Sequence, residues 1–147
     1  MNDPIVIEVP LRKNYPFQYE NFLLATQHDL YLLIEKEGTS VSALKFKFGS
    51  FRYGGPNDEA RGSHPMTKYG LGWYGLYKVE HSPWILERMI ANRIHPKHND
   101  SMFAGEMHFI ACFKDVMLEV VCRDFEEVQI EEAELVGILQ QQIGYLE

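Results

Sequence analysis

The segment 107–122, MHFIACFKDVMLEVVC, constrains the fold more than any other part of this 147-residue chain. Two apolar runs with alternating side chains flank Lys114 and Asp115, a pattern typical of two antiparallel strands joined by a tight turn. A two-residue turn at this pair places Met107 opposite Cys122. We therefore predict a β-hairpin whose register follows from the turn.

This register divides the hairpin side chains between two faces. The second face carries His108 and Glu119 as diagonal neighbours on a half-polar surface. A carboxylate that orients an imidazole makes a usable general base, so this pair is one candidate for catalysis. The first face is apolar and is predicted to be core; it comprises Met107, Phe109, Ala111, Phe113, Val116, Leu118, Val120 and Cys122.

The remaining elements predict an α+β fold in a single domain, 1–147, with a twisted antiparallel sheet of meander and hairpins. Two helices are expected, at about residues 83–94 and 131–143, the first with Ser82 as its N-cap and Pro83 in its first turn. Leu86, Met89, Ile90 and Ile94 follow helical spacing and are predicted to form the buried stripe of the first helix. Strands are expected at 5–9, 22–26, 30–35, 42–48, 73–80 and 128–130, with a β-bulge at Gly49.

The charge of the chain is concentrated near one end. Residues 1–114 carry 13 Lys and Arg against 12 Asp and Glu, whereas residues 115–147 carry 1 against 9, so the two parts stand at +1 and −8. An acidic surface repels phosphates, so we expect no nucleic-acid and no membrane partner, and a basic protein is the favoured partner. Without a secretory signal or an apolar run long enough to cross a bilayer, the chain is expected to be cytoplasmic.

Residues 54–72, which precede the strand expected at 73–80, are too rich in glycine for regular structure, and with Trp73 and Tyr74 they make up the candidate loop 54–74. A loop this long inside a compact domain favours a recognition or active site. The alternative is a plain connection in which Asp58 pairs with Arg61 and the aromatic side chains pack into the core. The candidate binding residues are Arg52, Tyr53, Asn57, Asp58, Arg61, His64, Tyr69, Trp73 and Tyr74, and Asp58 with His64 is a second candidate catalytic pair.

The segment HPKHND contains His95, His98 and Asp100, side chains of the kind that bind zinc, iron or manganese. Such a site needs a further ligand from elsewhere in the chain. The alternative is that both histidines cap the end of the preceding helix. We therefore expect no cofactor, with a metal ion as the less favoured possibility.

The middle of the chain, residues 55–121, resembles a set of small uncharacterised bacterial proteins. The resemblance rests on the order of GPNDEA, HP, YGL, YG, SPWI, HP and HFIACFKD in this sequence. It implies one compact domain and carries no activity, ligand or partner with it.

Two functions remain open from the sequence, which holds no complete catalytic fingerprint. The favoured hypothesis is a non-enzymatic binding protein that uses the loop 54–74 and the acidic C-terminal third, as an immunity or antitoxin-like protein would against a basic toxin. A small ligand is a further possible occupant of the loop. The alternative is a small metal-assisted hydrolase using His95 and His98. The oligomeric state does not follow from the sequence.

Overall fold

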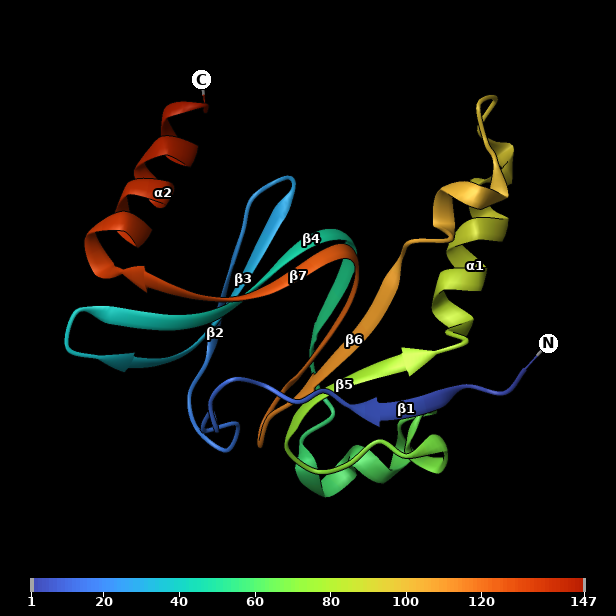
Figure 1. Cartoon of the computed structure of the whole chain (residues 1–147), viewed down its shortest axis with the longest axis horizontal. Coiled ribbons are helices and arrows are strands. Elements are labelled where there is room, and N and C mark those ends of the chain that lie inside the picture. Colours follow the sequence, from blue (N-terminus) through green and yellow to red (C-terminus); the bar gives the residue numbers. More distant parts are fainter. Residues whose placement is uncertain (1, 147) are drawn as a thin grey trace.

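A computed structural model describes residues 2–146 and contains a seven-stranded antiparallel sheet with two α-helices (Figure 1). The strands lie in the order β1-β5-β6-β7-β4-β3-β2. This confirms the predicted α+β class with a twisted antiparallel sheet. The strands are β1 (Ile5–Glu8), β2 (Phe22–Ala25), β3 (Asp29–Glu37), β4 (Ser40–Gly54), β5 (Gly75–Glu80), β6 (Met107–Cys112) and β7 (Met117–Glu131).

The hairpin of β6 and β7 has the register that its turn predicts. Met107 pairs with Cys122 and Cys112 pairs with Met117, so the two cysteines lie at opposite ends and are free thiols. The Phe113 amide donates to the Val116 carbonyl at 3.0 Å across the turn. The apolar face lies in the largest core cluster, as predicted, with Phe109, Ala111, Phe113, Leu118, Val120 and Cys122 buried and with Met107 and Val116 packed against them.

Strands β4 and β7 are each 15 residues long and pair along their whole length. The register shifts on both sides of Phe48, which leaves Gly49 unpaired and confirms the predicted bulge. Residues 128–130 form a strand as predicted, but they are not a separate element, because they belong to the last part of β7. Its acidic middle section belongs to the sheet because the facing positions of β4 are basic: Lys45 pairs with Glu126 and Lys47 with Asp124.

Both faces of the sheet are covered. Tyr15 and Phe17, from the segment between β1 and β2, pack into the core of one face. The opposite face is covered in two places, which lie at the two ends of the long strands. At one end Met66 and Leu71 from the loop 55–74 pack over Ile110 of β6, and at the other α2 packs over Tyr31, Leu33 and Ala43.

The second helix, α2 (Glu132–Gly144), agrees with the predicted span to within one residue at each end. The first, α1 (Pro83–Ala91), ends earlier than predicted and continues as a 3-10 turn, η3 (Asn92–Ile94). Further 3-10 turns are η1 (Asp58–Ser63), η2 (Thr67–Tyr69) and η4 (Asp100–Phe103). In residues 2–146 the helices are too short or too polar to span a bilayer.

The predicted buried stripe of α1 is wrong in its second half. Ile90 is 49% exposed and Ile94 is 93% exposed, and the one buried residue of α1 is Trp84 in its first turn. The reason is the direction of the helix: α1 begins at the end of β5 and then leads away from the sheet (Figure 1). Only its first turns have a sheet to pack against, so helical spacing alone overstates its burial.

Candidate functional site

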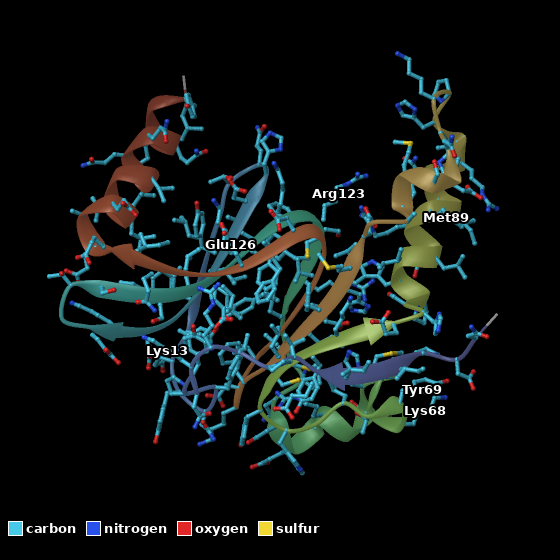
Figure 2. All side chains as sticks on the ribbon, in the orientation of Figure 1. Lys13, Lys68, Tyr69, Met89, Arg123 and Glu126 are labelled. Carbon is cyan, nitrogen blue, oxygen red and sulfur yellow. The ribbon has the colours of Figure 1, made fainter. Side chains whose placement is uncertain are left out.

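The loop 55–74 connects β4 to β5 and is folded through two 3-10 turns onto the sheet. Asn57 begins the first turn, where its side chain accepts a hydrogen bond from the Ala60 amide at 3.1 Å. Gly70 ends the second turn at φ +117°, a conformation that favours glycine. Tyr69 and Lys68, at the outer end of this loop, lie beside β1 (Figure 2). The loop is therefore ordered by its own turns.

Arg61 holds the loop to the β6–β7 turn from inside the protein. Its side chain is 3% exposed, and Nη1 donates to the carbonyl of Trp73 at 2.7 Å. The other terminal nitrogen, Nη2, donates to the carbonyl of Phe113, with a weaker contact to Val116 at 3.5 Å. One guanidinium thus joins the start of the loop, the end of the loop and the hairpin turn. The predicted alternative, an ion pair of Arg61 with Asp58, is not formed.

Asp58 instead makes two other contacts at the same end of the sheet. Its amide donates to the carbonyl of Lys114 at 2.7 Å, and its carboxylate accepts the Tyr74 hydroxyl hydrogen bond at 2.6 Å. This hydrogen bond, with a smaller effect of burial, raises the pKa of Tyr74. The catalytic pair predicted between Asp58 and His64 does not form either, since His64 faces β7.

Some aromatic side chains of the site pack against the core, and others are exposed to solvent. Tyr69 and Tyr74 are half-buried against the core, whereas Trp73 is 66% exposed. Tyr53 is 40% exposed and donates a hydrogen bond to Asn21 at 2.6 Å. A hollow of about 170 Å³ lies beside Trp73; Arg61, Gly62, Thr67, Leu71, Gly72 and Trp73 line it. Trp73 is therefore a large aromatic group presented to solvent beside a small depression.

A second cluster lies on the same sheet face, where Glu119 of β7 accepts hydrogen bonds from two histidines. Nε2 of His64 lies 2.9 Å from one carboxylate oxygen, and Nε2 of His108 lies 3.1 Å from the other. The predicted pairing of His108 with Glu119 is present, and His64 joins it from the loop. Nδ1 of His108 is in turn 2.7 Å from the Ser82 hydroxyl.

The positions of the protons in this cluster follow from its partners. Met66 donates its amide to Nδ1 of His64 at 3.0 Å, so that nitrogen is an acceptor and Nε2 carries the proton. The ionised carboxylate of Glu119 only accepts, so neutral His108 also carries its proton on Nε2. Its Nδ1 then accepts from the hydroxyl of Ser82. Both rings are oriented as donors to one negative charge.

These donors determine the ionisation of Glu119. Burial is the largest single effect and by itself would raise the pKa of this carboxyl, but the hydrogen bonds from His108 and His64, together with the charge interactions of the two histidines, outweigh burial and hold the pKa at about 2. The side chain is 13% exposed and those of His64 and His108 are 10% and 3% exposed. A carboxylate without these partners would be costly at this depth.

The hydrogen-bonded chain of Ser82, His108 and Glu119 has the arrangement of a nucleophile, a general base and an orienting carboxylate. Such a chain can act on a substrate only if the serine and the histidine are accessible to it. Ser82 is 8% exposed, and its oxygen also accepts the Ile85 amide hydrogen bond as the cap of α1. Both ring nitrogens of His108 and of His64 are engaged with protein groups. The cluster ties the loop, β6, β7 and α1 together and leaves no ring nitrogen free for a substrate.

Arg52 and Trp84 complete this face. The guanidinium of Arg52 lies 4.1 Å from the centre of the Trp84 ring, and the rings of Trp84 and His108 are nearly perpendicular, with centroids 5.3 Å apart. Arg52 also pairs across the strands with Glu119. The sequence points to Arg52 as a site residue, but it does not indicate Trp84 or the role of Ser82 beyond the helix cap.

The candidate metal residues lie apart from both clusters. His98 bonds to Asn92 at 2.8 Å and to the carboxylate of Asp100, and Asp100 also receives two hydrogen bonds from Arg93. The bonds from Arg93 and His98 lower the pKa of Asp100 to about 2. Within residues 2–146, no three His, Cys, Asp or Glu side chains are grouped as a metal site. In this part of the chain, the other histidines His64, His81 and His108 do not complete such a group with His95, His98 and Asp100.

Comparisons with models of protein families, with curated proteins and with solved structures found no match to this chain. The functional interpretation therefore rests on the geometry of the loop.

Proposed function

We propose that this protein binds a basic protein partner through the loop 54–74, with Trp73 as the anchor residue, and that it has no enzymatic activity. The observation that carries the proposal is the contrast at Trp73: the side chain is 66% exposed, while its own carbonyl is held by the buried Arg61 at 2.7 Å. An aromatic group on a rigid backbone loses little conformational entropy on binding. Exposed tryptophans beside a depression are frequent hot spots of protein interfaces.

The size of the hollow at Trp73 favours a protein over a small ligand. Pockets for small molecules have volumes of about 300–1,000 Å³, and the hollow at the indole has about 170 Å³. A larger hollow of about 930 Å³ lies between residues 8–18 and 74–76, and it includes Tyr74 but not Trp73. The site at Trp73 suits one projecting side chain of a partner rather than an enclosed molecule.

The net negative charge of the chain favours a basic partner, because it attracts positive charge over a long range. Three acidic residues of the C-terminal third are paired within the fold: Glu119 is enclosed by histidines, and Asp124 and Glu126 pair across strands with lysines. Glu132, at the start of α2, bonds to Lys36 at the far end of the long strands. A net charge of −7 attracts a basic protein and increases its association rate without direct contacts. This mode of action is that of an immunity or antitoxin-like protein.

A pull-down from cells of the native host with the immobilised chain tests the proposal. We expect a basic protein to be captured by the unmodified chain, to be lost with Trp73→Ala, and to be released by increasing salt. Ile94→Ala is the matched control, because Ile94 is 93% exposed on a different element. Circular dichroism must show that both variants fold. Equal capture by the Trp73 and Ile94 variants would show that the loop does not bind the partner.

The metal-assisted hydrolase is tested by elemental analysis of the tag-free protein. About one zinc, iron or manganese ion per chain, lost in a His95→Ala/His98→Ala double variant, would support the hydrolase over the binding protein. We expect the double variant to have the same metal content as the unmodified chain, because His98 is already engaged by Asn92 and Asp100.

A further inference from the structure

A hollow beside α1 has the size of a small-molecule site. Its volume is about 510 Å³, within the range of about 300–1,000 Å³ that such pockets have. It lies between α1 and the segment that returns from η4 to β6, where both leave the sheet (Figure 1). None of the residues that line it belongs to the loop 54–74. The hollow is therefore distinct from the surface proposed to bind a protein.

One part of the lining is apolar. Ile85, Leu86 and Met89 come from α1, and Phe103 and Met107 come from the returning segment. All five residues are half-buried, so they keep apolar surface that the fold itself does not cover. Removing such surface from water is favourable, so these side chains can hold the apolar body of a bound molecule.

The charged part of the lining is mostly acidic. It consists of one lysine, Lys78, and three carboxylates, those of Glu80, Asp100 and Glu106. Two of these carboxylates are already paired: Glu80 lies 3.5 Å from Lys78, and Asp100 accepts hydrogen bonds from Arg93. An anion would meet more negative than positive charge in this lining, which favours a cation instead.

Glu106 supplies the acceptor that remains. Its side chain is 5% exposed, and Oε1 accepts a hydrogen bond from Nη2 of Arg88 at 3.3 Å. The second oxygen, Oε2, is buried and has no hydrogen-bond partner within residues 2–146. A buried acceptor without a donor costs free energy, which a new donor recovers. Hydrogen bonds from a cation to a carboxylate are about twice as strong as those between neutral groups, so a cationic donor recovers most.

We propose that this hollow binds a small organic cation, an amine or a guanidine attached to an apolar body. The cationic group donates to Oε2 of Glu106, and the body lies against α1 and Phe103. Because Oε2 is closed to solvent, binding includes a rotation of the Glu106 side chain toward the cation. A carboxylate accepts several hydrogen bonds, so Arg88 and the ligand can share it. A neutral apolar molecule would leave Oε2 without a charged donor, and an inorganic cation would leave the apolar surface uncovered.

Three probes with the same apolar body and different charge test the class of ligand. Phenethylamine is a cation, phenethyl alcohol is neutral and phenylpropionate is an anion. In an NMR titration of the isotope-labelled chain to about 10 mM probe, we expect phenethylamine to shift the amides of residues 78–82 and 103–107. It should bind at least about tenfold more tightly than phenethyl alcohol, and phenylpropionate should bind most weakly. Equal affinities of the amine and the alcohol, shifts confined to other parts of the chain, or no saturable binding of the amine would overturn the proposal.

Substitutions in the lining test the acceptor. We expect Glu106→Gln to weaken phenethylamine binding at least about tenfold, because it removes the charge of the carboxylate. The matched control is Glu80→Gln, at a lining carboxylate that is 43% exposed and paired with Lys78, and it should change the affinity by less than about threefold. Equal effects of the two substitutions would contradict the role of Glu106.

A third variant tests the hollow without changing its charge. Met89→Trp places a larger side chain on the α1 wall, and we expect it to abolish phenethylamine binding. Circular dichroism must show which variants fold, and this one keeps the test decisive if Glu106→Gln does not. Unchanged binding in a folded Met89→Trp chain would show that the amine binds elsewhere.

Discussion

Replacing Glu119 by glutamine tests whether the two histidines hold a buried carboxylate in its charged form. Glutamine has nearly the same shape, but its amide offers one acceptor oxygen and one NH₂ group instead of two acceptor oxygens. His64 cannot adapt, because the Met66 amide keeps its proton on Nε2. In the variant, the Nε2–H group of one histidine therefore faces the amide oxygen of the glutamine. The Nε2–H group of the other histidine faces the NH₂ group, which cannot accept its hydrogen bond unless His108 changes its tautomer.

The magnitude follows from the pKa. In the folded chain the pKa of Glu119 is about 2 against an ordinary value of 4.5, because the hydrogen bonds and charge interactions of both histidines together outweigh the effect of burial. At 1.36 kcal/mol for each pKa unit, this difference corresponds to roughly 3 kcal/mol of stability at neutral pH. Partial exposure of the carboxylate screens the interaction, so we expect Glu119→Gln to lower the free energy of unfolding by about 2 kcal/mol at about pH 7.

The pH dependence gives the sharper test. Because the folded pKa lies below the unfolded one, the stabilisation is complete above about pH 4.5 and is lost as the pH falls toward about 2. Urea unfolding of both proteins at about pH 7, about 5 and about 3.5 measures the difference between them. We expect that difference to be constant from about pH 7 to about 5 and to shrink by roughly a third to a half by about pH 3.5.

The control is Glu126→Gln, on the same strand but exposed. We expect it to change the free energy of unfolding by less than about 0.5 kcal/mol at neutral pH. If Glu119→Gln matched this control, or if its cost did not depend on pH, the carboxylate would not be held in its charged form by the histidines.

Two further changes test how the loop and α1 are held. Arg61→Met removes the hydrogen bonds to the carbonyls of Trp73 and Phe113. We expect the Asp58 amide to lose about 2–4 kcal/mol of protection against hydrogen exchange. Unchanged protection would show that the arginine does not anchor the loop. Gly49→Ala places a methyl group 2.6 Å from the Arg88 guanidinium and should cost about 1–3 kcal/mol in urea unfolding. The loss of stability caused by Gly49→Ala should be smaller in a chain that also carries Arg88→Ala. An equal loss with and without Arg88→Ala would show that the strain lies in the backbone of the bulge.

Some parts of the candidate site follow from the sequence because they depend on strand parity. Side chains alternate along a strand, so the turn at Lys114 and Asp115 is enough to place His108 and Glu119 on one face. The same parity predicts the bulge at Gly49, where the apolar positions change sides. These predictions are confirmed because each depends only on residues close in the sequence.

The features that the sequence did not predict, or predicted wrongly, depend on contacts between distant segments. His64 is 55 residues from Glu119, and nothing in the spacing of the two indicates that they meet. The acidic part of β7 does not look like a strand until the lysines of β4 are known to face it. The apolar residues of α1 predict a buried stripe, but burial also needs a neighbour, and Ile94 has none within the described chain that shields it.

The sequence by itself determines the class of fold, the central hairpin with its register, the bulge, the span of α2 and the overall acidity, because periodicity, turn residues and charge are local properties. The tertiary structure decides what the loop does. It places Arg61 under the loop, joins His64 and His108 to Glu119, and leaves Trp73 and the outer face of α2 exposed. Such outcomes depend on which buried polar groups find partners and which apolar groups find cover, and both are determined only when the whole chain has packed.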